Sequence, residues 1–301
     1  MTVHHIPVML KEVLETLSPK DNETILDGTF GAGGYTRAIL DSCNCNVIST
    51  DRDENVKVFA DDVKSEYGDR FNFLNIRFSE IISNVEKHSL DGIVLDLGVS
   101  SMQLDSTERG FSFNKEAKLS MAMGRNKLTA YDVVNGFRED EIIDILYKYG
   151  DETKCRLITK KIVDYRKNKK IETTTELANI VKSCFDERFC KINPATKTFQ
   201  AIRIYVNDEI NELKNILYDS LSLLKENGRL IVVTFHSLED GIVKSFLRRN
   251  INCEKINKFS TCNRMRLEFK SISKNPIIVS EEEVERNPRS RSAKLRWGIK
   301  W

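Results

Sequence analysis

Leu26-Asp-Gly-Thr-Phe-Gly-Ala-Gly-Gly-Tyr-Thr-Arg37 is the stretch that decides how this chain folds. A β-prone apolar run, Thr24–Leu26, leads into it, and Tyr35–Leu40 continues with helical character. Three glycines let the backbone approach a ligand closely: Gly31, Gly33 and Gly34. A strand, a glycine turn and a helix in this order place free N–H groups beside a bound cofactor.

The next apolar run, Asn46–Asp51, ends in a carboxylate. Asp51 stands about twenty residues after Gly31, which is the usual spacing in cofactor-binding units of this kind. A carboxylate at this strand tip can accept hydrogen bonds from both hydroxyls of a ribose. The sequence therefore predicts a cofactor that contains a ribose.

The glycine spacing distinguishes between two classes of cofactor. A nicotinamide dinucleotide fingerprint needs a third glycine where this chain has Thr36. Asp27 at the strand tip, followed by Gly31-x-Gly33-Gly34, resembles instead the loop of class I S-adenosylmethionine (SAM) methyltransferases. A carboxylate at Asp27 suits the ammonium group of SAM. Taken alone, the loop leaves open a plain strand-to-helix turn without a ligand.

The composition indicates a globular protein. Of 301 residues, 40% are hydrophobic and 31% are charged, which is ordinary for a soluble domain. The chain shows no signal-peptide pattern and no apolar run of about 18 residues, so we expect a cytoplasmic protein without membrane association. Its seven cysteines include no Cys-x-x-Cys pair, so we expect reduced, structural thiols and no metal site.

Positive charge gathers in two places. Residues 241–301 hold 15 Lys and Arg against 6 Asp and Glu, whereas residues 1–240 hold 32 against 39. A second basic cluster consists of Lys160, Lys161, Arg166, Lys167, Lys169 and Lys170. Because Lys and Arg release counterions when they neutralise phosphates, two clusters favour a polyanionic substrate. A merely solvated surface stays open for the second cluster.

Strand and helix signals alternate through the first hundred residues. The apolar runs are Thr24–Asp27, Asn46–Asp51, Phe71–Ile76 and Gly92–Leu97. This alternation is typical of βαβ units and a parallel sheet. From Met102 to Val206 no buried-strand run occurs, and the sequence shows a loop and amphipathic segments: Thr107–Leu119, Glu139–Tyr149 and Thr175–Cys184.

The alternation then returns. We expect a helix over Asn207–Lys225, capped at Gly228, a strand over Arg229–Phe235, and closing strands at Leu267–Ile272 and Leu295–Ile299. The predicted fold is α/β, a Rossmann-like and mostly parallel sheet with an inserted all-helical subdomain. Residues 1–102 form the first part of the core, 103–206 the substrate-recognition insertion, and 207–301 the second part with its basic tail.

Candidate catalytic residues lie at strand ends, where ligands bind in open parallel sheets. Phe78 follows the third strand and is placed to stack on a base. Methyl transfer to a base amine requires groups that accept the amine proton. We expect Asp96, or a serine at Ser100 or Ser101, to do so with His236 opposite. For His236, a cap of the next helix formed with Ser237 and Asp240 stays open.

Six motifs carry a closer resemblance: Asp27–Gly34, Leu95–Ser101, Glu108–Phe113, Ala195–Ile204, Phe235–Asp240 and Asn287–Arg296. In this order, and with His5–Val8 before them, they resemble the RsmH (MraW) family of 16S rRNA cytosine-N4 methyltransferases. The resemblance implies a class I methyltransferase core, SAM as methyl donor and 16S rRNA of the small ribosomal subunit as partner. The implied substrate is a cytidine of the decoding centre.

The resemblance also implies a set of SAM contacts: Gly33, Gly34, Tyr35, Asp51, Phe78, Asp96 and Gln103. Asp27 and Gly31 complete the predicted cofactor site. Tyr35 stands where the family usually has His, and Ser120 and Ala122 replace an Asp and an Arg. A methyltransferase for another base amine and a non-catalytic ribosome-assembly factor remain the alternatives, and monomer and homodimer both stay open.

Overall fold

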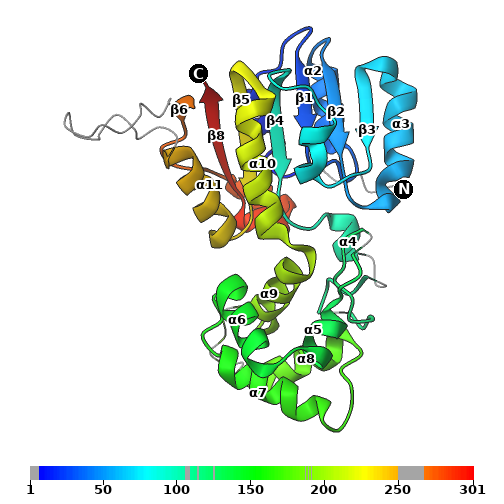
Figure 1. The fold of residues 1–301 in the computed structure, drawn as a ribbon, viewed down its shortest axis with the longest axis vertical. Coiled ribbons are helices and arrows are strands. Elements are labelled where there is room, and N and C mark those ends of the chain that lie inside the picture. The colour runs from blue at the N-terminus through cyan, green and yellow to red at the C-terminus, as the bar shows by residue number, and fades with distance from the viewer. Residues whose placement is uncertain are drawn as a thin grey trace, which may run out of the picture. The chain divides into compact units, whose positions relative to one another are not determined.

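The computed structural model describes residues 7–105, 109–113, 115–124, 126–186, 188, 190, 192–249 and 268–301. The chain forms two compact units, Met1–Gly98 with Asn211–Trp301, and Val99–Ile210 (Figure 1). Several residues used above lie outside the described set: His5, Thr107, Glu108 and Leu267. Ser101 is described by its backbone only.

The first unit is built on an eight-stranded sheet. In spatial order its strands are β3 (Phe71–Leu74), β2 (Asn46–Thr50), β1 (Thr24–Asp27), β4 (Leu90–Asp96), β5 (Leu224–Thr234), β8 (Lys294–Lys300) and β6 (Phe269–Ile272), and β7 (Ile277–Ile278) also pairs with β8. The first five run parallel, and β8 is antiparallel to β5, β6 and β7. This topology confirms the predicted class I methyltransferase fold.

The central strands are apolar on both faces. Ile93, Val94 and Leu95 of β4 are fully buried, and Leu26 of β1 pairs with Ile93. Helices cover the sheet: α1 (Leu10–Leu17), α2 (Gly34–Ser42), α3 (Lys57–Tyr67), α10 (Glu209–Leu223) and α11 (Ser237–Arg249), of which Figure 1 labels the last four. The short helix α12 (Glu281–Arg286) contacts the 3-10 turn Pro288–Ser292 that follows it. Continuous apolar runs are what a parallel sheet requires, because both of its faces are removed from water.

The junction between α10 and β5 differs from the expectation. The predicted cap at Gly228 is wrong, because α10 ends at Leu223 and the chain enters β5 directly at Leu224. Leu224 is fully buried and pairs with Leu90, so its burial ends the helix earlier than the glycine would. The strand register shifts before Arg229, and Asn227 takes up the turn with φ +66°.

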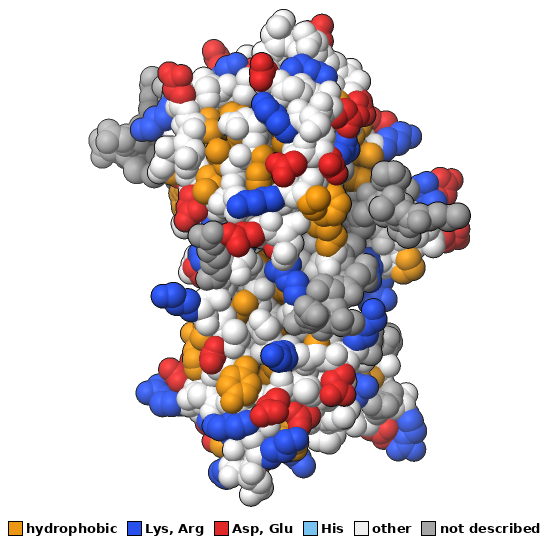
Figure 2. Space-filling model, turned by 90° about the vertical axis from the view of Figure 1, so that its right-hand side faces the viewer, with side chains coloured by type: hydrophobic (Ala, Val, Ile, Leu, Met, Phe, Trp, Pro, Cys, Tyr) orange, Lys and Arg blue, Asp and Glu red, His pale blue; other side chains and the backbone are white. Residues whose placement is uncertain are grey.

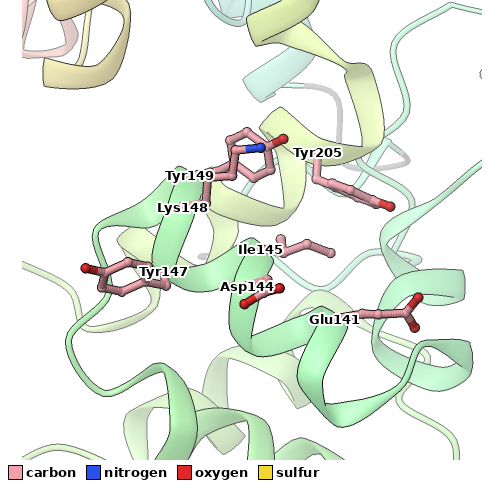
Figure 3. A pocket seen from close by; sticks show the side chains of 7 residues that line it. All are labelled: Glu141, Asp144, Ile145, Tyr147, Lys148, Tyr149 and Tyr205. Atoms are coloured by element: carbon pink, nitrogen blue, oxygen red, sulfur yellow. The ribbon is translucent and has the colours of Figure 1, made fainter.

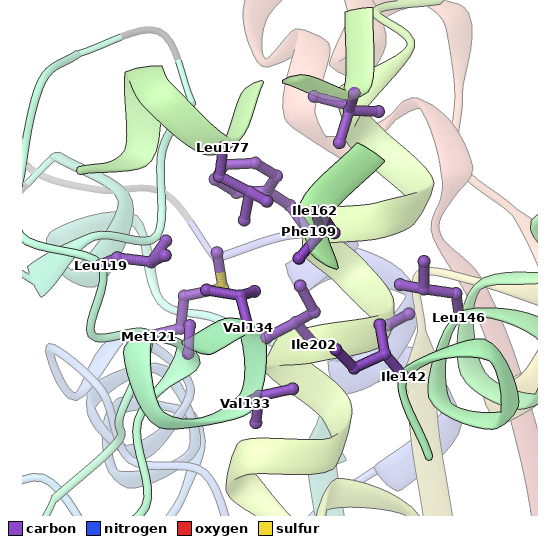
Figure 4. Close-up of a cluster of buried hydrophobic side chains, with 14 of the residues drawn as sticks. Leu119, Met121, Val133, Val134, Ile142, Leu146, Ile162, Leu177, Phe199 and Ile202 are labelled. Carbon is purple, nitrogen blue, oxygen red and sulfur yellow. The ribbon is translucent and has the colours of Figure 1, made fainter. Parts of the chain in front are cut away.

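The second unit is helical, as predicted. Its helices are α4 (Ser101–Asp105), α5 (Ala130–Gly136), α6 (Glu139–Gly150), α7 (Cys155–Arg166), α8 (Thr174–Lys182) and α9 (Ala195–Asn207). Val133, Ile142, Ile162, Leu177 and Ile202 meet in one buried cluster (Figure 4). No strand occurs among the described residues of this unit. Its role in recognising the substrate stays a prediction.

Candidate active site

The glycine segment after β1 folds into a tight cradle. Gly31 and Gly33 have φ of +55° and +79°, in the left-handed region that favours glycine. Gly33 donates to the carbonyl of Phe30 (2.8 Å), and Phe30 in turn packs on Phe71 and Phe73. A Cβ at Gly33 would lie 3.0 Å from the Phe30 ring, so a side chain there would push the loop out of shape.

Asp27 ends β1 and is completely buried. Its Oδ1 accepts from the Thr29 N–H (3.1 Å), and its Oδ2 accepts from the Thr36 hydroxyl (2.7 Å), which also lies 2.7 Å from the Ser49 hydroxyl. Burial raises the pKa of Asp27 to about 6, against the lowering effect of these hydrogen bonds. Asp27 thus fastens α2 to β1 and β2, and its contact with a cofactor ammonium stays a prediction.

Asp51 directly follows β2 and faces the glycine segment. Its Oδ2 accepts from the Gly31 N–H and its Oδ1 from the Asp53 N–H, both at 2.8 Å. A carboxylate oxygen has two lone pairs, so each oxygen keeps one for a further donor. Burial raises the pKa of Asp51 to about 6. This geometry allows Asp51 to accept two neighbouring hydroxyls at once, as the ribose prediction requires.

Asp96 ends β4, next to β1. Its N–H donates to the Thr29 hydroxyl (2.7 Å), but no described residue donates to its buried Oδ1. Burial, followed by the charges of Asp27, Glu239 and Glu283, raises the pKa of Asp96 well above its usual range. A buried acceptor without a donor costs about 1–3 kcal/mol, so this oxygen suits a ligand that brings a donor or a positive charge.

Phe78 opens the 3-10 turn Phe78–Ser83 after β3 and is only partly buried. Its Cβ lies 3.5 Å from the place a Cβ would take at Gly28. Both neighbours of Phe78 are held by Glu212 of α10, which accepts from Arg77 (3.1 Å) and Ser79 (2.7 Å). Glu212 fixes this ring position, and no signal in the sequence indicated it.

His236 occupies the N-cap position of α11. Its Nδ1 accepts from the Glu239 N–H (3.4 Å), and the Glu239 carboxylate accepts from the N–H groups of Phe235 (2.9 Å) and His236 (3.4 Å). This is a capping box with His at the cap and Glu three residues later. The box expected from Ser237 and Asp240 is therefore displaced by one residue. His236 also brings its Nε2 to 3.0 Å from Glu239 Oε1.

The remaining predicted contacts lie in different surroundings. Tyr35 is buried in α2 and its hydroxyl donates to the Val8 carbonyl. Gln103 belongs to the helical unit, where its Oε1 accepts from the Ser100 N–H (3.1 Å). The structure brings Asp27, Asp51 and Asp96 to the strand ends of one sheet edge. For Gln103 and Ser101, a place in the same site stays a prediction.

The C-terminal motif serves two purposes. Arg296 of β8 is buried and forms a two-point pair with Asp240 of α11, at 2.6 and 3.2 Å. Bidentate pairs of this kind fix geometry, so Arg296 holds β8 against the start of α11. Arg289 and Arg291 are exposed. The positive charge of the tail is therefore only in part available to a polyanion.

The second basic cluster is also divided by the structure. Arg166 donates to the carbonyls of Val134 (2.8 Å) and Phe137 (2.6 Å), and Lys167 and Lys169 pair with acidic residues. Three members have neither an ion pair nor a hydrogen bond within the described part of the chain: Lys160, Lys161 and Lys170. Arg156, one turn before Lys160, is equally unpaired there. On the face in Figure 2, basic and acidic side chains are interspersed.

The segment around Ser120 and Ala122, where the chain departs from the family pattern, is fixed by hydrogen bonds of its backbone. Asn207 is fully buried, donates to the Met121 carbonyl (2.8 Å) and accepts from the Met123 N–H (2.7 Å). The Ser120 hydroxyl accepts from the Ala122 N–H (3.4 Å). None of these hydrogen bonds needs the charges that Ser120 and Ala122 replace, so the local fold persists without them.

A cavity of about 520 Å³ lies in the helical unit, on α6 and α9 (Figure 3). Its lining combines aromatic and acidic side chains: Glu141, Asp144, Ile145, Tyr147, Lys148, Tyr149 and Tyr205. Two carboxylates make the cavity unsuitable for a phosphate backbone.

Within the described residues, no His, Cys, Asp and Glu side chains group as a metal site, and no helix is long and apolar enough to span a bilayer.

Known proteins resemble this chain over almost its whole length. The model of the MraW methylase family matches residues 2–300. The protein named Ribosomal RNA small subunit methyltransferase H from Rickettsia massiliae (strain Mtu5) is 50% identical over 300 residues, covering 98% of each chain. Its counterpart from Rickettsia conorii (strain ATCC VR-613 / Malish 7) is 49% identical with the same coverage.

Solved structures are more distant in sequence. A putative rRNA-methylase from Clostridium thermocellum shares 11% identity, covers 99% of this chain and 100% of its own, and has a TM-score of 0.43. The sheet order, the cradle after β1 and the strand-end carboxylates agree with the family match along residues 2–300. The chain belongs to the MraW methylase family.

Proposed function

We propose that this chain uses SAM to methylate the N4 amine of a cytidine in 16S rRNA of the small ribosomal subunit, in the decoding centre. The observation that carries the proposal is the 50% identity, over 98% of both chains, to a protein named for methylation of small-subunit rRNA. The cytidine and its N4 come from the six motifs that resemble the RsmH family. We place the reaction in the cytoplasm, where this substrate is made.

The cradle fits SAM by its own chemistry. The two free lone pairs of Asp51 match the ribose hydroxyls, Asp27 is the carboxylate expected at the ammonium group, and the unpartnered Oδ1 of Asp96 is open to a further donor. The start of α2 at Gly34 turns backbone N–H groups of its first turn toward the ligand, while the Gly33 N–H is taken by the Phe30 carbonyl. When bound, SAM supplies an electrophilic methyl group on a positively charged sulfur.

The residues of the chain then have to orient the amine and remove its proton. Asp96 and Val233 are paired in neighbouring parallel strands, so the segments that follow them, with His236, emerge at the same sheet edge. The raised pKa of Asp96 makes its charged form a stronger base than an ordinary carboxylate, and the positive charge of bound SAM would favour that charged form. We propose Asp96 as the acceptor, with His236 and Ser101 as the other candidates.

RNA binding would use basic side chains in two places. On α7, Arg156, Lys160 and Lys161 have no ion pair within the described part of the chain, and in the tail the side chains of Arg289 and Arg291 are exposed. The three on α7 can neutralise phosphates without first breaking an ion pair, which favours counterion release. The alternative of a non-catalytic assembly factor is less well supported, because the three carboxylates that we expect at SAM, Asp27, Asp51 and Asp96, are all present in the chain.

Transfer of labelled methyl groups from SAM separates the candidates. Small subunits that lack the modification should gain label in 16S rRNA, and digestion to nucleosides should place it on N4 of cytidine. Label in another base would support a methyltransferase for a different amine. Absence of label, with SAM binding intact, would support the assembly factor.

A further inference from the structure

The segment Pro7–Met9, called here the N-terminal segment, lies directly against the start of α2. A Cβ at Gly34 would overlap the Pro7 ring. Position 34 must therefore be glycine to leave room for Pro7, whether or not a cofactor also approaches it. Next to it, the Tyr35 hydroxyl donates to the Val8 carbonyl. Two consecutive residues of the cofactor loop thus make room for, and hold, the same piece of chain.

Glu283 holds the N-terminal segment from its other side. Its Oε1 accepts from the Met9 N–H at 2.8 Å, across 274 positions of sequence. Met9 is fully buried and has φ +55°, a conformation that a residue with a side chain adopts only where its surroundings impose it. Ser280 caps α12 by accepting from the Glu283 N–H (3.2 Å), so the position of Glu283 is itself fixed.

We propose that Glu283 and Tyr35 are positioning residues of the SAM site, which act by clasping the N-terminal segment against the glycine loop. A clasped segment keeps the left-handed turn at Gly33 and the start of α2 at Gly34 in place, so that ordering the loop is not part of the cost of binding SAM. Tyr35 then contributes through Val8 and not through a side-chain contact with the cofactor. The inference rests on SAM being the ligand of this loop.

Calorimetric SAM titration of four variants tests the proposal. Glu283→Ala removes the acceptor for Met9, and Tyr35→Phe removes only the hydroxyl. Each should raise the Kd for SAM about tenfold, the effect of losing one hydrogen bond of this kind. Glu283→Gln keeps an oxygen acceptor at the same place and should stay within about threefold of the parent protein. Glu285→Ala, on the exposed face of the same helix, should bind SAM normally.

A split of the kinetic constants distinguishes positioning from loss of stability. With saturating SAM, Glu283→Ala and Glu283→Gln should methylate at the same kcat, because both remove the charge that acts on Asp96, while KM for SAM rises only in Glu283→Ala. Glu23→Gln weakens an ion pair with Arg229 at the opposite end of β1 and β5, so it destabilises the same unit without touching the loop. It should leave KM for SAM unchanged.

Three results would overturn the proposal. Normal SAM affinity in Glu283→Ala or Tyr35→Phe would show that the N-terminal segment is irrelevant to the loop. Glu283→Gln as weak as Glu283→Ala would assign the effect to charge and not to the clasp. A higher KM for SAM in Glu23→Gln would show that the effect of Glu283→Ala comes from a general loss of stability. If the parent protein itself bound no SAM, the proposed function would fail first, and the titration would show this before any variant is compared.

Discussion

The hydroxyl of Thr36 donates to Oδ2 of Asp27 across 2.7 Å, inside the protein and out of contact with water. Thr36 is the residue that stands where a dinucleotide fingerprint has its third glycine. A glycine at this position allows helix and strand to pack closely, whereas the Thr36 side chain joins α2 to β1 by a hydrogen bond. Thr36, which is incompatible with a nicotinamide dinucleotide fingerprint, therefore stabilises the loop that we expect to bind SAM.

Thr36→Val should destabilise the protein by about 1–3 kcal/mol, because a buried acceptor loses its donor without a change of shape. Urea unfolding at neutral pH measures this loss. Thr36→Ser keeps the hydroxyl and should recover most of it. Equal stability of the valine variant would mean that the hydrogen bond contributes nothing net.

The loss in Thr36→Val should depend on pH in a defined direction. Asp27 has a pKa of about 6 when folded and 3.8 ordinarily, so the folded state binds the extra proton between these values. Stability from this group is thus fully present below about pH 4 and is lost as the pH rises through about 6. Because the Thr36 hydrogen bond favours the charged form, its removal should cost more at pH 7 than at pH 5.

Asp51→Ala should weaken SAM binding by about 1.5–3 kcal/mol, the range for hydrogen bonds to a charged group. In the parent protein the affinity should rise with pH up to about 6 and then level off, since the Asp51 carboxylate must be charged to accept both hydroxyls. Calorimetry between pH 5 and 8 measures both. Asp51→Asn, which cannot titrate, should show a smaller pH dependence. An unchanged affinity in the alanine variant would refute the ribose assignment.

His236 requires variants that separate capping from chemistry. His236→Ala loses the cap of α11 and should destabilise the protein by about 0.5–2 kcal/mol. His236→Ser restores a cap but not a proton acceptor. If His236 takes part in the reaction, single-turnover methylation should remain slow in the serine variant, at parental stability and SAM affinity. Parental rates in His236→Ser would restrict histidine to the cap.

Lysines in and just after α7 offer a matched test of RNA binding. Lys160→Gln/Lys161→Gln and Lys167→Gln/Lys169→Gln remove the same charge, but only the second pair is already neutralised by acidic neighbours. The first double variant should weaken RNA binding and lower the salt slope by up to about 1.4, for two phosphate contacts on a single strand. The second should change little. Equal effects would indicate a response to net charge alone.

Reversing the charge of Arg289 and Arg291 tests the tail. Arg289→Glu/Arg291→Glu should weaken RNA binding and flatten its salt dependence while SAM affinity stays unchanged. Filter binding at several salt concentrations, with calorimetry for SAM, measures both. Loss of both affinities together would point to a folding role, comparable to that of Arg296.

The sheet could be predicted from local sequence because each central strand is a short apolar run. Thr24–Asp27 is a strand with the predicted bounds, since a short apolar run between turns has little alternative. Asp27, Asp51 and Asp96 followed from the rule that ligands lie at strand ends. Residues near one another in the chain, such as Gly31 and Gly33, could be interpreted together.

Contacts between distant segments could not be predicted in this way. Glu212 braces the neighbours of Phe78 from more than 130 positions away, and Glu283 reaches Met9 across 274. Neither glutamate belongs to a motif. The helix cap moved from Ser237 to His236 because the Glu239 side chain reaches back to two N–H groups, a choice that depends on three-dimensional geometry and not on residue type.

The position of β8 in the sheet has a consequence for how the protein is made. β8 lies between β5 and β6, although it follows both in the chain. During synthesis β6 emerges before the strand that joins it to the sheet, and β5 keeps an open edge until Lys294–Lys300 has left the ribosome. The parallel strands from β3 to β5 can assemble earlier. β8 therefore adds to the open edge of an existing sheet and brings β6 with it, and the unpaired edge of β5 is exposed to wrong partners until then.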